Sequence, residues 1–195
     1  MHRLLFLAAF LGVSASAQDA PALALDAPRV LHDATTELKG PDGTPTVYRF
    51  TTTFDPATGE YLRTVRDASG SVVREEALTA TLVAPTLEED AYARAAIEAD
   101  PEIAALIAEA EYPVKVTGGF VLSREEGHAC GPRTRCLQYD VLETLPDRKT
   151  ARRVRYVVID LRTGEIVSRN FDPDAEGNLA NPAFRVDSRL TDAAE

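Results

Sequence analysis

The chain has 195 residues, with 31 acidic side chains against 21 lysines and arginines, which gives a formal net charge of −10 at pH 7. This length is enough for one domain of ordinary size, or two small ones, with a buried core. The acidic balance disfavours nucleic acid and anionic lipid as partners, because the phosphates of both would repel it. Acids concentrate in residues 83–112 and arginines in residues 133–169, which we interpret as a helix and a sheet face with complementary charge.

The first residues have the pattern of a cleavable signal peptide. His2 and Arg3 give a positive start, residues 4–13 are apolar, and residues 14–17 are small. The apolar run is too short to cross a bilayer, and no later stretch is apolar enough. We therefore expect residues 1–17 to be a signal peptide and the protein to be periplasmic or secreted, without a membrane span.

Residues 18–45 are rich in alanine, proline and aspartate without a sustained period, which predicts a flexible leader. Residues 46–84 predict an N-terminal antiparallel β-meander. Runs of β-branched and aromatic residues are separated there by turn sequences at residues 55–60 and 67–70. Residues 78–83 are a candidate for a further strand.

Residues 85–171 predict a helical segment followed by antiparallel strands. Thr86 and Glu89 have the spacing of a capping box, and Pro101 either kinks one helix or begins a second. A period of two returns after Pro113. This order predicts an α+β fold, in which the helical segment packs on a twisted antiparallel sheet and the meander lies in the same or a second subdomain. The predicted core residues are Ile103, Leu106, Ile107, Phe120, Leu137, Tyr139, Val154, Tyr156 and Val158.

Residues 172–195 are polar and predict an irregular C-terminal tail. Residues 172–178 match the start of a calcium loop, but Ala180 and Ala183 stand where later oxygen ligands belong, so we expect a turn. The frame D-x-x-T-G-E occurs at residues 55–60 and again at 160–165. Because Asp and Gly suit any hairpin turn, two independent hairpins explain the frame as well as divergent repeats do.

Cys130 and Cys136 are the only cysteines, and they are separated by five residues. In an oxidising compartment such a pair predicts a structural disulfide. Two alternatives stay open. His128 with the two cysteines would offer three ligands for copper or zinc, and the cysteines alone would form a redox-active pair.

No sequence pattern identifies a catalytic residue or a cofactor. Past the signal peptide the chain has two histidines, His32 and His128, and it has neither a G-x-S-x-G sequence nor a glycine-rich phosphate loop. A hydrolase with a pair of carboxylates is conceivable, but sequence does not locate a pair whose required spacing is spatial.

The acidic helix followed by antiparallel strands ends in residues 153–167, which read RVRYVVIDLRTGEIV. This order resembles PepSY domains, whose final hairpin often reads strand, Asp, Thr-Gly, strand. It is also similar to the cystatin-like N-terminal domains of copper amine oxidases, in which residues 86–89 would have a counterpart. The resemblance covers residues 85–171 and implies a non-catalytic module that binds or inhibits another exported protein or peptide. Metal handling through His128, Cys130 and Cys136 and a carboxylate hydrolase are the alternative functions.

Overall fold

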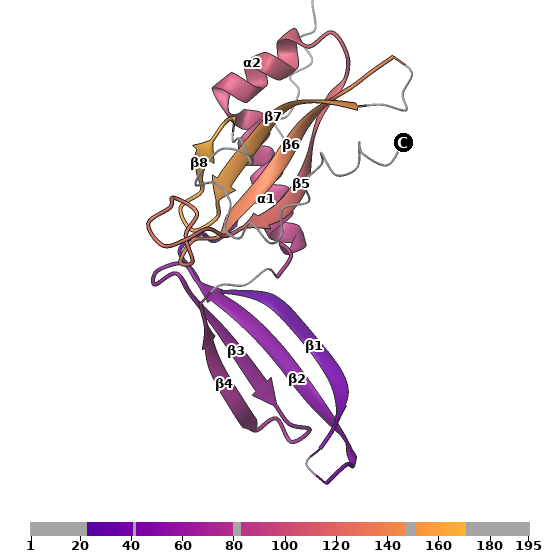
Figure 1. The fold of residues 1–195 in the computed structure, drawn as a ribbon, viewed down its shortest axis with the longest axis vertical. Helices are drawn as coiled ribbons and strands as arrows, with labels where there is room; N and C mark the ends of the chain where they lie inside the picture. The colour runs from indigo at the N-terminus through magenta and orange to yellow at the C-terminus, as the bar shows by residue number, and fades with distance from the viewer. Residues whose placement is uncertain (1–22, 41, 80–82, 147–150, 171–195) are drawn as a thin grey trace, which may run out of the picture.

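The computed structural model describes residues 23–40, 42–79, 83–146 and 151–170 (Figure 1). These residues form an α+β fold with two helices and two antiparallel sheets of four strands each. Sheet A contains, in spatial order, β1 (Arg29–Lys39), β2 (Pro45–Asp55), β3 (Glu60–Arg66) and β4 (Val72–Leu78). Sheet B contains β5 (Val114–Leu122), β6 (Cys136–Thr144), β7 (Ala151–Asp160) and β8 (Glu165–Ser168). The helices are α1 (Leu87–Ala99) and α2 (Pro101–Glu109).

Sheet A extends the predicted meander by one strand. The expectation that residues 18–45 are a flexible leader is wrong for β1, which pairs with β2 from Arg29 opposite Phe54 to Lys39 opposite Pro45. This strand lacks a continuous apolar stripe because it lies at the edge of a sheet that no helix covers among the described residues. Leu31 is its one buried residue, packed with Phe54 and Tyr61, and backbone pairing holds the rest. The further strand expected over residues 78–83 falls mostly on residues 80–82, which lie outside the described part; the last described strand of sheet A, β4, ends at Leu78.

The helical segment is two helices in series, which settles the alternative that the sequence left open. Thr86 caps α1, because its Oγ1 accepts from Glu89 N at 3.1 Å while the Glu89 carboxylate accepts from Thr86 N at 3.1 Å. Asp100 is extended and caps α2 by accepting from the backbone N–H groups of Glu102 and Ile103. Pro101 then occupies the first turn, where its missing N–H costs nothing.

The main core lies between the helices and one face of sheet B. Of the predicted core residues, Ile103, Leu137 and Tyr139 are fully buried there, while Leu106, Ile107 and Val154 are partly buried against it. Its other fully buried members are Ala93, Ile97, Val141, Val157, Ile159 and Leu161.

Phe120 was expected in the core but is 63% exposed. Gly118 and Gly119 both have positive φ, and the pairing of β5 with β6 shifts between Gly118 and Phe120. The extra residue in this β-bulge turns the following side chains to the opposite face of the sheet. The period-two prediction was therefore wrong after residue 118.

A smaller cluster lies on the other face of sheet B. It contains Leu122, Val158 and the two cysteines, with Tyr156 packed against it. Val158 is buried as predicted, but beside the disulfide rather than under the helices, because its neighbours Val157 and Ile159 take the core positions. The sequence pattern showed alternation along β7 without showing that both faces of the strand are covered.

None of the described helices is long and apolar enough to span a membrane. The predicted signal peptide, the calcium-like turn and the C-terminal tail lie outside the described residues.

Candidate functional site

The two sheets meet at a contact region that we call the joint. It consists of the β2–β3 turn (residues 55–60), the loop between the cysteines (residues 130–136), the β7–β8 turn (residues 160–165) and the N-terminal end of α1. The joint fixes sheet A to the α+β unit formed by sheet B and the helices.

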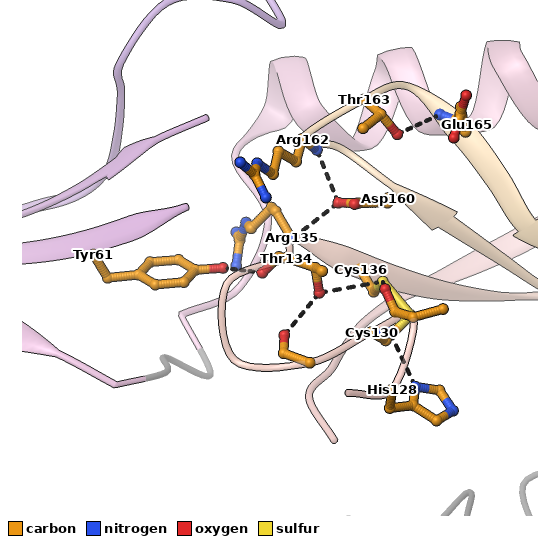
Figure 2. Close-up of a disulfide and its surroundings, with 12 residues drawn as sticks. Tyr61, His128, Cys130, Thr134, Arg135, Cys136, Asp160, Arg162, Thr163 and Glu165 are labelled. Atoms are coloured by element: carbon orange, nitrogen blue, oxygen red, sulfur yellow. Dashed lines mark hydrogen bonds between the residues drawn. A yellow bond between two sulfur atoms is a disulfide. The ribbon is translucent and has the colours of Figure 1, made fainter. Parts of the chain in front are cut away.

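Cys130 and Cys136 form a disulfide with their Cα atoms 5.6 Å apart, and both residues are fully buried. The bridge closes a short loop in which the Thr134 hydroxyl donates to Gly131 O at 2.9 Å. Tyr61 on β3 reaches this loop and donates its hydroxyl to Thr134 O at 2.5 Å (Figure 2). The disulfide loop is therefore the surface on which sheet A docks.

A buried group of charges lies behind this loop. The Glu89 carboxylate accepts from Arg135 at 2.9 Å, and Arg29 Nε lies 3.4 Å from it. The side chains of Glu89 and Arg135 are 0% exposed and that of Arg29 is 9% exposed. Arg135 also donates to the carbonyls of Val83 and Ala84 at 2.9 and 3.3 Å. Arg29 from sheet A, Glu89 from α1 and Arg135 from the disulfide loop thus share one ion cluster, which joins three segments distant in sequence.

The two D-x-x-T-G-E turns belong to different sheets, yet they contact each other. Asp160 accepts from the backbone N–H groups of Arg135 and Arg162 at 3.0 and 2.9 Å. The Arg162 guanidinium then donates to the carbonyls of Pro56 and Ala57 in the other turn, at 2.7 and 3.1 Å. The repeated frame therefore supplies both sides of the joint, whether or not it arose by duplication.

The joint is also tightly packed at Tyr61 and Gly59. Burial raises the pKa of the Tyr61 phenol to about 12, so the hydroxyl stays a hydrogen-bond donor over the physiological range. A Cβ atom added at Gly59 would lie 2.3 Å from the carbonyl oxygen of Arg133. Only a glycine lets the turn approach the disulfide loop this closely.

The residues of the metal hypothesis lie together, but not as a set of ligands. His128 Nδ1 accepts from Cys130 N at 2.9 Å, and both sulfur atoms are used in the disulfide, so neither is a thiolate. Over the described residues, no group of three or more His, Cys, Asp or Glu side chains is placed to hold a metal ion. With the disulfide intact, His128, Cys130 and Cys136 offer at most one imidazole nitrogen.

The carboxyl groups of the described residues bear on the hydrolase hypothesis. The described carboxyl groups with a displaced pKa all have it lowered, and they are Asp33, Asp42, Asp67, Asp90 and Asp100. For Asp100 the main cause is the hydrogen bond from Arg169; for Asp90 partial burial opposes the shift, but bonds from Arg94 and Tyr139 outweigh it. A general acid at neutral pH needs its pKa raised, the opposite direction.

The ends of the β1–β2 and β3–β4 hairpins point away from the joint (Figure 1), and we call this region the distal tip. Apolar side chains are exposed there. They are those of Leu38, Val47, Val72 and Val73, which are between 42% and 52% exposed. Near the joint, by contrast, Phe54 and Tyr61 of the same sheet are at most 3% exposed. The joint end of sheet A thus buries two aromatic side chains, although Val30 beside them on β1 is 52% exposed, whereas all four apolar side chains of the distal tip are exposed.

No protein-family model matches the chain, and a search of curated proteins finds no match. The resemblance to PepSY and cystatin-like domains therefore stays a prediction. Sequence reasoning identified the cysteines and His128 but missed Arg29, Glu89 as a buried ion, and Arg135. Arginines are frequent throughout this region, and nothing local distinguishes the buried one.

Proposed function

We propose that the protein is an exported, non-catalytic binding module whose distal tip docks on another protein. The observation that carries this proposal is the exposure of Leu38, Val47, Val72 and Val73 at the end of a sheet whose other end is fixed by the joint. Several exposed apolar side chains at one end of a folded protein are typical of interaction surfaces. The resemblance to PepSY and cystatin-like domains supports the same class of function.

The pairing register indicates the shape of the partner. Thr46 lies opposite Leu38 and Val47 lies opposite Glu37, so Leu38 and Val47 project from opposite faces of sheet A. A flat partner would cover only one of these faces. We therefore infer a partner with an apolar groove that surrounds the tip.

The test is site-specific crosslinking in the native host. A photo-crosslinking amino acid at Val47 or Val73 should give the same adduct, whereas one at Glu165, which is exposed on β8, should not. Absence of an adduct at the tip, or equal adducts at all three positions, would refute the proposal.

The captured protein must then bind the purified chain through the tip. Val72→Asp with Val73→Asp should weaken binding by at least tenfold, because two valines are removed from the contact and charges are placed there. Leu87→Asp is the matched control, since Leu87 is 87% exposed at the start of α1, and it should leave the affinity unchanged. Both variants must keep the unfolding midpoint of the parent, so that loss of binding is not loss of fold.

A further inference from the structure

A groove lies beside α2, at the end of sheet B remote from sheet A (Figure 1). Its volume is about 500 Å³, within the range of ligand-binding clefts. Aliphatic side chains from α2, β5 and β7 line it, namely Ala105, Leu106, Val114 and Val154. The groove shares no residue with the joint or the distal tip, so an occupant here would be a second one.

The helix that walls the groove is only lightly packed. Ile103 is the only buried residue of α2. A second hollow of about 390 Å³ lies along Ala104, Ile107 and Ala108 and also reaches Val114. Since hollows flank it on two sides, α2 is a ridge with apolar surface still open to a partner.

The charges around the groove are unequal. Four glutamates and two arginines line it. Arg152 forms an ion pair with Glu143, whose residue is 3% exposed, and these two charges cancel. Arg155 donates to Val154 O at 2.8 Å, a backbone carbonyl that carries no formal charge. Glu102 in turn lies 3.9 Å from the Nε atom of Arg169, which is outside the groove. Two glutamates, Glu109 and Glu111, then face one arginine, Arg155.

We propose that this groove binds a basic, aliphatic peptide segment of a partner protein. A leucine, isoleucine or valine side chain would lie on the floor formed by Leu106, Val114 and Val154, and flanking lysines or arginines would lie against Glu109 and Glu111. The acidic excess selects against an acidic peptide, because like charges at the rim oppose its approach. This proposal is independent of the distal tip and goes beyond the proposed function.

Calorimetric titration of the full chain with three acetylated, amidated heptapeptides tests the ligand class. One alternates lysine and leucine, one alternates lysine and serine, and one alternates glutamate and leucine. The lysine–leucine peptide should bind. The lysine–serine peptide should bind at least tenfold more weakly, since burial of one leucine accounts for a tenfold change or more, and the glutamate–leucine peptide should not bind measurably. If the two lysine peptides bind with equal affinity, the binding is explained by the general attraction of an acidic protein for a basic peptide, and the proposal is overturned.

Charge reversal tests the location. Glu109→Lys with Glu111→Lys should lower the affinity for the lysine–leucine peptide by at least tenfold. Glu37→Lys with Glu75→Lys makes the same change in net charge on exposed positions of sheet A and should change the affinity by less than about twofold, because distant surface charges are screened by salt. Ala105→Trp, which fills the groove without changing charge, should abolish binding.

Two results would overturn the location or the occupant. Equal loss in both charge-reversed variants would place the peptide elsewhere. Light scattering of the parent chain measures whether it forms a dimer. If it does, and the dimer dissociates in the Glu109→Lys, Glu111→Lys variant, the groove is occupied by a second copy of this chain. The unfolding midpoint of each variant serves as the check on folding.

Discussion

Replacement of Gly59 by alanine should destabilise the protein more than the same replacement at Gly70. Both glycines lie in hairpin turns of sheet A with positive φ, 72° and 85°. An alanine in this conformation costs about 1–2 kcal/mol at either position. At Gly70 the new methyl group would meet nothing within 4 Å, whereas at Gly59 it would lie 2.3 Å from Arg133 O and 2.9 Å from Arg133 Cβ. Moving the disulfide loop aside should add about 1–3 kcal/mol, as overpacking does in other well-packed sites.

The measurement is urea-induced unfolding of the oxidised chain, followed by circular dichroism for the parent and both variants. The Gly59→Ala midpoint should fall below that of Gly70→Ala by an amount equal to at least about 1 kcal/mol in the free energy of unfolding. The two variants share the sheet and a glycine with positive φ, so the difference reports chiefly the contact with Arg133. Equal midpoints would show that the β2–β3 turn does not press on the disulfide loop, and the reasoning about the joint would be wrong.

Three more predictions concern the joint. Arg135→Met should lower the free energy of unfolding by about 3–5 kcal/mol, because it leaves the fully buried Glu89 carboxylate short of a partner. A second change, Glu89→Gln, removes that charge and should recover at least about 1 kcal/mol. If denaturant unfolding shows that the effects of the two substitutions simply add, the ion cluster is contradicted. The pKa of Tyr61 is raised from an ordinary 10.0 to about 12 in the folded chain, so between these pH values the folded state keeps a proton that the unfolded state loses. The contribution of the protonated Tyr61 to the free energy of unfolding is therefore complete below pH 10 and is lost as the pH rises to 12. Thermal unfolding should show this loss in the parent chain and not in Tyr61→Phe. Protein purified without reductant should show no free thiols, and Cys130→Ala with Cys136→Ala should cost about 2 kcal/mol, the low end expected for so short a loop; two titratable thiols would reopen the metal hypothesis at His128.

Local chemistry made the hairpins and helix boundaries predictable. The D-x-x-T-G-E frame places a glycine where positive φ is needed, and both copies form turns between paired strands. Thr86 with Glu89 and Asp100 with Pro101 act as the helix starts that their spacing indicates. These signals involve residues at most a few positions apart, so a single sequence contains them in full.

Longer-range facts were not predictable in this way. β1 was missed because an edge strand of an uncovered sheet has no need for an apolar face, and its alternation is correspondingly weak. Phe120 was misplaced because a bulge at Gly118 and Gly119 inverts the faces, and glycine alone does not distinguish a bulge from a bend. Arg135 lies 46 residues from Glu89 along the chain. Nothing in the sequence ties these two positions together, so the ion cluster that links the sheets had no local signature.

The contacts at the joint bear on how the two proposed surfaces work together. Among the described residues, sheet A contacts the α+β unit through the Arg29–Glu89–Arg135 ion cluster, the bond from Arg29 to Leu161 O, the bond from Tyr61 to the disulfide loop, and the bonds between the two turns. Loss of one of these contacts would leave the others in place, so a hinge between the sheets would require them to open together. Arg135 meets the Glu89 carboxylate through two nitrogens, Nε at 3.3 Å and Nη2 at 2.9 Å, and such a two-point contact accepts few relative orientations. The distal tip and the groove beside α2 lie at opposite ends of this arrangement (Figure 1), and a partner held at one end would therefore leave the other end accessible.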